Sequence, residues 1–167
     1  AATALLLLSP QIPMLFMGEE QGSETPFLFF TDFHDELADA VREGRRREFA
    51  KFAAFADPDT RAAIPDPNAV ATFDASRTVP GPAADDWRTF YRHLLALRHT
   101  LIVPHLAGAT ALNAVATGDA AVTARWRLAD GSTLGFAIDL GDAPAPLPTP
   151  PGVIVTDSTR FVAWIAR

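Results

Sequence analysis

The chain has 167 residues, of which 49 % are hydrophobic and 20 % are charged, a composition typical of a globular protein and not of a disordered one. The net charge of −6 argues against nucleic acid as a partner, because phosphate binding needs a basic surface. The absence of cysteine excludes disulfides, zinc–thiolate sites and thiol nucleophiles, and it fits a cytoplasmic protein.

The first residues are strongly apolar. Residues 1–8 have the pattern of the end of a helix that stops at Ser9-Pro10, because proline cannot continue a helix. The apolar run is shorter than the roughly 20 residues of a membrane span, so no membrane partner is predicted. A signal peptide has a basic residue before its apolar stretch, whereas the first basic residue here is Arg42, so a signal peptide is not predicted. We therefore expect the sequence to start inside a buried helix of a longer protein.

The next segment is predicted to be a strand. Ile12–Met17 is an unbroken apolar run that ends at Gly18. A strand that is apolar on both faces belongs in the middle of a parallel sheet or barrel. Glu19–Phe33 follows as a loop rich in acidic and aromatic residues. This order of helix, turn, buried strand and polar loop indicates an α/β protein.

Two further helices are predicted. Glu36–Phe55 has apolar residues at helical spacing. Residues 56–84 are predicted to be irregular, because Asp-Pro and Pro-Gly pairs mark turns within them. A helix capped by Asp85 or Asp86 then shows an apolar stripe at spacings of three and four residues, and it ends near Pro104.

Beyond that helix the apolar period changes from 3.6 to 2. Four strands are predicted, at residues 122–128, 133–138, 153–155 and 161–165. Asp130-Gly131 is a hairpin signal between the first two strands, and the prolines from Pro144 to Pro151 predict a stiff surface loop. The predicted fold class is therefore α/β plus all-β, with one domain at residues 1–103 and an antiparallel β domain at 104–167.

Acidic and aromatic residues after the predicted strand are candidates for a binding site. Glu19 and Glu20 follow the strand, where barrel enzymes build their sites, but they could instead pair with arginines at the barrel rim. As neighbours they diverge and cannot form a catalytic dyad alone. Sugars stack on aromatic rings and donate hydrogen bonds to carboxylates, so the loop with Asp32 and Phe33 is a second candidate.

Other residues of this region favour structural roles. Phe27 and Phe29 are expected to be core residues that cover the barrel, because phenylalanine is often fully buried. Arg45–Arg47 are expected to form a solvated helix face paired with Glu43 and Glu48, with phosphate or nucleic-acid binding as the alternative.

The remaining polar and aromatic residues suggest no cofactor. Three histidines between residues 93 and 105 recur every six positions, which rotates them about 240° apart on a helix, so no metal site is predicted. Trp126 and Trp164 are expected to pack in the core, with a surface glucan platform as the alternative.

Four motifs in chain order resemble a known family. They are LSPQIPMLFMGEE (8–20), PFLFFTDF (26–33), VREGRRREF (41–49), and IPDPN (64–68) with Thr72-Phe73 and Ser76. Together they are similar to the malto-oligosyltrehalose trehalohydrolases of the α-amylase superfamily, over residues 8 to about 100. One departure is Gln21, where that family more usually has an aromatic residue.

The resemblance implies a fold and an activity. The fold is the carboxy-terminal end of a (β/α)8 TIM barrel, followed by an antiparallel β-sandwich domain. Because a complete barrel needs about 250 residues, the chain is expected to be a fragment whose partner is the missing amino-terminal part of the same enzyme. The implied enzyme is a retaining glycoside hydrolase that cleaves the α-1,4 bond next to the trehalose end of maltooligosyl trehalose.

The resemblance places the reacting carboxylates on earlier strands, so no catalytic residue is assigned here and the isolated chain is expected to be inactive. Substrate binding is expected of Glu19, Glu20, Asp32 and Phe33, with a malto-oligosaccharide or trehalose-type glycan as the partner. No cofactor and no metal are implied. The alternatives are a fragment of a glucan branching or debranching enzyme, a non-catalytic carbohydrate-binding or assembly module, and a truncated product without a separate role.

Overall fold

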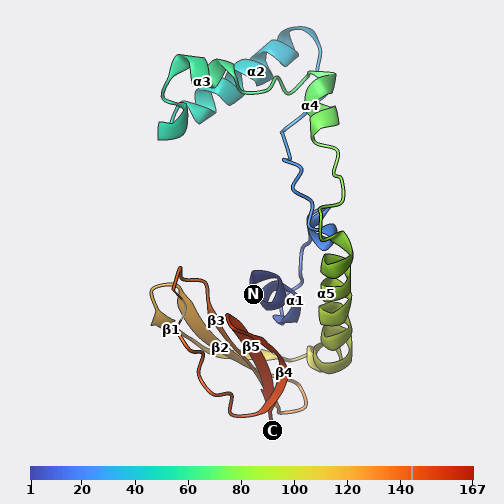
Figure 1. The fold of residues 1–167 in the computed structure, drawn as a ribbon, viewed down its shortest axis with the longest axis vertical. Helices are drawn as coiled ribbons and strands as arrows, with labels where there is room; N and C mark the ends of the chain where they lie inside the picture. Colours follow the sequence, from blue (N-terminus) through green and yellow to red (C-terminus); the bar gives the residue numbers. More distant parts are fainter. Residues whose placement is uncertain (144) are drawn as a thin grey trace. The chain divides into compact units, whose positions relative to one another are not determined.

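The computed structural model describes residues 1–143 and 145–167, which form a helical region followed by an antiparallel sheet (Figure 1). The chain divides into two compact units, one of residues 1–16 with 85–167 and one of residues 17–84. Pro144, the first proline of the predicted surface loop, lies outside the described residues. Within the described part of the chain, no helix is long and apolar enough to cross a membrane.

The sheet has five antiparallel strands in the order β1-β2-β3-β5-β4. They are β1 (Thr110–Gly118), β2 (Ala121–Arg127), β3 (Thr133–Asp139), β4 (Val153–Ser158) and β5 (Phe161–Ala166). The four predicted strands are confirmed. β1 was not predicted, because all of its residues are exposed at the edge of the sheet and show no apolar alternation. The described residues form this single sheet and not the second sheet of the predicted sandwich.

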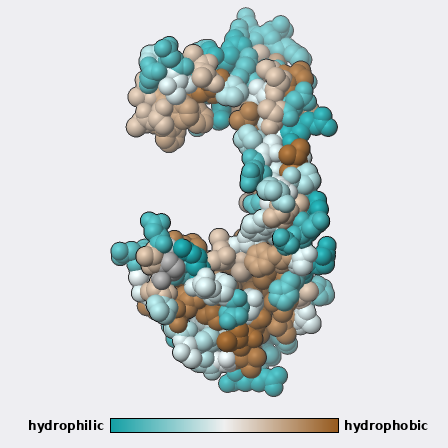
Figure 2. Space-filling view, viewed as in Figure 1, coloured by the Kyte–Doolittle hydropathy of each residue, from teal (hydrophilic) through white to brown (hydrophobic). Residues whose placement is uncertain are grey.

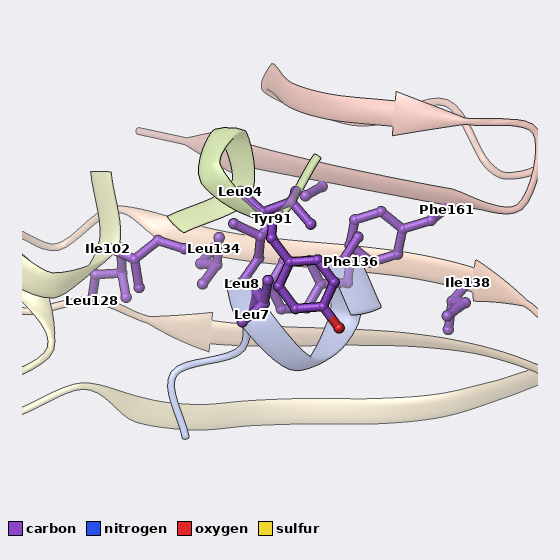
Figure 3. Packing of buried hydrophobic residues seen from close by; sticks show 12 residues of the cluster. Leu7, Leu8, Tyr91, Leu94, Ile102, Leu128, Leu134, Phe136, Ile138 and Phe161 are labelled. Carbon is purple, nitrogen blue, oxygen red and sulfur yellow. The ribbon is translucent and has the colours of Figure 1, made fainter. Parts of the chain in front are cut away.

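The two predicted helices at either end of the helical region are confirmed, and both cover one face of the sheet. They are α1 (Ala2–Leu8) and α5 (Ala84–Leu97), and α5 continues as a π-helical turn, η3 (Arg98–Ile102), and a 3-10 turn, η4 (Val103–His105). Their apolar side chains meet those of β3 and β5 in one core (Figure 3). Its largest fully buried side chains are Phe136, Phe161, Leu7, Leu8, Leu94, Ile102 and Leu134. Burial of each such side chain stabilises the unit by about 1.5–3 kcal/mol.

The opposite face of the sheet is covered by Trp164. This side chain is buried and packs against Leu147 of the proline loop. A Cβ on Gly135, its cross-strand partner, would lie 2.3 Å from Trp164 Cε2, so only glycine admits the indole here. Trp126 packs against the helix-covered core, with its ring 5.3 Å from that of Phe136. The expected core packing of both tryptophans is confirmed.

The unit of residues 17–84 consists of short helices joined by extended loops. Its helical elements are η1 (Glu19–Gln21), α2 (Asp35–Phe49), η2 (Ala53–Phe55), α3 (Pro58–Ala62) and α4 (Val70–Ala75). The predicted helix Glu36–Phe55 is confirmed as α2 but ends at Phe49. The prediction that residues 56–84 are irregular is wrong at α3 and α4. A start signal for α3 was available, because Asp57 caps its first turn and Pro58 follows.

The prediction of a buried strand at Ile12–Met17 is wrong for this structure. The segment is not a strand, and Ile12 and Met14 are 93 % and 87 % exposed. A strand needs a neighbour that pairs with its backbone, and within the described residues every strand belongs to the carboxy-terminal sheet. The observed architecture is therefore a helical region followed by a five-stranded antiparallel sheet, which does not by itself demonstrate a barrel end.

Candidate functional site

The loop that contains the predicted sugar-contact residues is held in place by a second extended segment. Residues 21–31 run beside residues 67–81 (Figure 1). The connecting hydrogen bonds are Gly81 N–H to Gln21 O (3.1 Å), Val79 N–H to Thr25 Oγ1 (3.2 Å), Leu28 N–H to Ser76 Oγ (3.0 Å) and Thr31 N–H to Pro67 O (2.8 Å). The approach is closest at Gly81, where a Cβ would lie 1.9 Å from Gly22 O, so this contact requires glycine.

Asn68 fixes the far end of the loop. Its Oδ1 accepts hydrogen bonds from Thr31 Oγ1 at 2.8 Å and from the Phe33 N–H at 3.0 Å. Its Nδ2 donates to the carbonyl of Ala38 in α2 at 3.3 Å. One side chain therefore ties the loop residues on both sides of Asp32 to the helix that follows. We call these three hydrogen bonds the Asn68 clamp.

Asp66 holds Asn68 and α2 together. Its carboxylate accepts from the backbone N–H of Asn68 at 3.0 Å and from the Arg42 guanidinium at 3.0 Å, while its carbonyl accepts from Thr72 Oγ1 at 2.6 Å. The hydrogen bond from the Asn68 N–H, followed by that from Arg42, holds the pKa of Asp66 below its usual value. The same contact with Asp66 raises the pKa of Arg42. The clamp is thus anchored by a charged pair at neutral pH.

The structure brings two of the four predicted contact residues together. Asp32 and Phe33 are adjacent on the clamped loop and exposed, and the Asp32 carboxylate lies 4.0 Å from His34 Nε2. Glu19 and Glu20 lie in η1, at the other end of the paired segments, and they too are exposed. A carboxylate oxygen of Glu20 accepts from the Gly18 N–H at 3.1 Å, so it braces its own turn.

Sequence reasoning did not find the residues that position the loop. Arg42, Asp66 and Asn68 contact residues far away in sequence, and the Asp-Pro-Asn run was interpreted as a turn and as part of a family motif, without a positioning role. The signal that was available is chemical. An Asx residue two positions after another Asx forms local hydrogen bonds through its backbone N–H, as Asn68 does with Asp66, and leaves its own amide free to bind elsewhere.

An apolar pocket lies behind the loop. It has a volume of about 390 Å³ and is lined mainly by Phe27, Phe29, Arg45, Phe49, Phe55 and Ile64. We call it the aromatic pocket. The expectation that Phe27 and Phe29 are buried in the core is wrong, since they are 51 % and 42 % exposed. Phe29 packs against the Arg45 guanidinium at 4.6 Å and Phe27 meets Phe30 edge to face at 5.7 Å, so both rings are partly covered.

The arginine run on α2 behaves as expected. Arg46 donates to Glu43 at 2.9 Å and Arg45 lies 3.7 Å from Glu48, so the predicted pairing with the glutamates is confirmed. The surface over α2 and α3 shows tan apolar areas beside the teal polar ones (Figure 2). The described residues include no group of three or more acidic or histidine side chains that could hold a metal ion.

A buried arginine in the other unit holds the segment that leads to Gly18. Arg98 is only 8 % exposed and donates to the carbonyls of Leu7 at 2.9 Å, Gln11 at 2.8 Å and Ser9. Burial lowers the pKa of Arg98. Its charge is stabilised by carbonyl dipoles at the carboxyl end of α1. These contacts fix the chain up to Gln11, after which the exposed apolar residues begin.

One protein-family model matches the region of the sheet. A family model described as "Domain of unknown function (DUF3459)" matches residues 109–161, which run from β1 into the start of β5. The sheet is therefore a recurring domain and not an irregular extension of the helices.

Comparison with curated proteins gives a more specific relationship. The chain is 43 % identical over 98 residues to a malto-oligosyltrehalose trehalohydrolase of Saccharolobus solfataricus, a match over 58 % of this chain and 15 % of that protein. It is 42 % identical over 106 residues to that of Deinococcus radiodurans, and 43 % over 115 residues to that of Arthrobacter ramosus. These matches cover 61 % and 62 % of this chain, and 17 % and 18 % of the two relatives.

The chain is homologous to malto-oligosyltrehalose trehalohydrolases, which confirms the resemblance of its motifs to that family. It spans only 15 to 18 % of the length of these relatives, and it is related to their carboxy-terminal region.

Proposed function

We propose that this chain is the carboxy-terminal part of a malto-oligosyltrehalose trehalohydrolase. In this proposal residues 1–103 complete a (β/α)8 barrel with its last strand, long loop and closing helices, and residues 104–167 form the small β domain. The enzyme cleaves the α-1,4 bond next to the trehalose end of maltooligosyl trehalose and releases trehalose. The observation that supports this best is the identity of 42–43 % to three trehalohydrolases.

The exposed segment Ile12–Phe16 supports the proposed barrel. Several exposed apolar side chains close together, here Ile12, Met14 and Leu15, indicate an interaction site. A neighbouring barrel strand from the amino-terminal part would pair with this backbone and bury Ile12 and Met14. The segment, held at Gln11 by Arg98, would then become the last strand and would deliver Glu19 and Glu20 to the rim of the barrel.

In this proposal the amino-terminal part of the enzyme cleaves the glycosidic bond. A retaining glycosidase needs two carboxyl groups about 5–5.5 Å apart, one as nucleophile and one as proton donor. We assign these groups to the amino-terminal part and give this chain a role in binding. Glu19, Glu20 and Asp32 would accept hydrogen bonds from sugar hydroxyls, and Phe33 would stack on a sugar ring. The absence of cysteine is consistent with a cytoplasmic enzyme.

A chimeric enzyme tests the proposal. The region of the Deinococcus radiodurans trehalohydrolase that matches this chain is replaced by residues 1–167, and trehalose release from maltotriosyl trehalose is measured. We expect the chimera to release trehalose, and the isolated chain to release none. A folded chimera that transfers or debranches α-glucan without releasing trehalose would instead support the related branching or debranching activity.

A second function is favoured by the open aromatic pocket. The chain could act as a non-catalytic carbohydrate-binding module, because exposed aromatic rings are the usual contacts of sugar rings. Binding of maltodextrin by the chain, together with a chimera that folds but has no hydrolytic activity, would support this function over the first.

A further inference from the structure

The aromatic pocket has the size and walls of a small-molecule site. Its volume of about 390 Å³ lies at the lower end of the range of about 300–1,000 Å³ for ligand pockets, so it suits one or two sugar rings. Phe49 meets Phe55 edge to face at 5.1 Å, which makes a firm wall on the α2 side. Phe27 and Phe29 form the open side. A ligand that covered them would remove apolar surface from water.

Arg45 is the charged group among the described residues that line this pocket, Thr60 being a second polar residue there, and it is held by stacking. Its guanidinium carbon lies 4.6 Å from the centre of the Phe29 ring and 4.8 Å from that of Phe49. Such contacts fix a guanidinium without using its N–H groups. Arg45 makes no hydrogen bond with any described residue, since the Glu48 carboxylate lies 3.7 Å away. Its N–H groups are therefore positioned by the two rings and by the ion pair with Glu48 at 3.7 Å.

The charge of Arg45 decides which ligand suits the pocket. Glu48 lies outside the pocket lining and balances that charge from 3.7 Å, and Arg45 is the one charged side chain that lines the pocket among the described residues. An anion would therefore find the charge of Arg45 already balanced by Glu48. A neutral ring with an apolar CH face and several hydroxyl oxygens would instead use both the phenyl walls and the N–H donors.

From this geometry we propose that the aromatic pocket binds a glucosyl residue of the malto-oligosaccharide, with Arg45 as its main hydrogen-bond donor. The proposal rests on the proposed function and adds a sugar site beyond the four predicted contact residues.

Titration of the full chain with maltotriose, followed by calorimetry, tests the pocket. We expect saturable binding, weakened about tenfold or more in Arg45→Gln, because hydrogen bonds from a charged donor are among the stronger polar contacts. Phe29→Leu keeps an apolar wall but removes the stacking face, and should weaken binding several-fold. Arg47→Gln changes an exposed arginine of the same helix outside the pocket, and should leave the affinity unchanged within about twofold.

Several results would overturn the proposal. One is the absence of saturable binding by the wild-type chain, and another is equal weakening by Arg45→Gln and Arg47→Gln. A third is binding of inorganic phosphate that displaces maltotriose, which would make the pocket an anion site. Thermal melting of each variant checks that it is folded. Arg45→Lys keeps the charge but removes the planar guanidinium with its several N–H donors, so it should weaken binding in a folded chain.

The chimera separates this inference from the proposed function. An active chimera made from a chain that binds no maltotriose would overturn the pocket and leave the proposed function intact. A chain that binds maltotriose through Arg45, in a folded chimera that releases no trehalose, would support the pocket and contradict the proposed function.

Discussion

Substitution of Asn68 by alanine tests the positioning of the predicted sugar-contact loop. The change removes the acceptor of the Thr31 hydroxyl and of the Phe33 N–H, and the donor to the Ala38 carbonyl. Three polar groups lose a protein partner in one substitution, and alanine introduces no steric conflict. The loop on both sides of Asp32 should therefore separate from α2 more often.

The size of the effect follows from the burial of the three hydrogen bonds. A typical protein hydrogen bond contributes about 0.5–1.5 kcal/mol net. Two of the three are partly buried, and the third, at the Phe33 N–H, is exposed and can be replaced by water. We expect Asn68→Ala to reduce the free energy of opening this loop by about 1–3 kcal/mol. That corresponds to about a 5- to 150-fold larger open population.

Amide hydrogen exchange followed by NMR measures this population directly. The amides of Thr31 and Phe33 should exchange faster in Asn68→Ala by the factor given above, while amides of the sheet should not change. Asn113→Ala is the matched control, because Asn113 loses one exposed hydrogen bond from Arg125 on β2. Unchanged exchange at Phe33 in the Asn68 variant would refute the clamp.

Three further predictions concern pH and packing. The hydrogen bond from the Asn68 N–H lowers the folded pKa of Asp66, so the ionised Asp66 stabilises the folded state at neutral pH, and this stabilisation is lost as the pH falls below about 4 through that lowered pKa. In thermal melts, Asp66→Asn should make the unfolding of residues 17–84 less sensitive to acid. An unchanged acid response would count against the pairing. Leu94→Ala removes a fully buried core side chain and should lower the free energy of unfolding, measured in urea, by about 2.7–5 kcal/mol. A decrease below about 1 kcal/mol would show that neighbouring side chains fill the cavity. Gly135→Ala places a Cβ against Trp164 and should destabilise the sheet by about 1–3 kcal/mol with a change in tryptophan fluorescence, and a neutral effect would contradict the close packing.

Elements with a strong apolar period could be predicted from the sequence. α5 buries one face, and β3 and β5 carry continuous apolar runs that are buried on both faces, so their patterns appear directly in the residue order. β1 buries neither face and α4 has only six residues, so neither produces a pattern long enough to detect. The resemblance of the motifs was confirmed by homology, because it depended on residue identities and not on periodicity.

The positioning of the candidate site could not be predicted in the same way. Asn68 bonds residues 30 to 37 positions away, and Ser76 bonds Leu28 at a separation of 48. Such pairings depend on two loops lying side by side, and a polar residue in a loop has many partners compatible with its sequence alone. The motif residues Asp66, Asn68, Thr72 and Ser76 therefore act through contacts that only the structure reveals.

The exposed segment Ile12–Phe16 shows how one sequence pattern can fit two environments. The six apolar residues of Ile12–Met17 predict a strand buried on both faces, and in this structure they form no strand and Ile12 and Met14 are largely exposed. Burial of Ile12 and Met14 beside a barrel strand would contribute about 1.5–3 kcal/mol for each side chain. Under the proposed function this gain would drive association with the amino-terminal part. Because Arg98 already fixes the backbone up to Gln11, less conformational entropy would be lost when the strand forms.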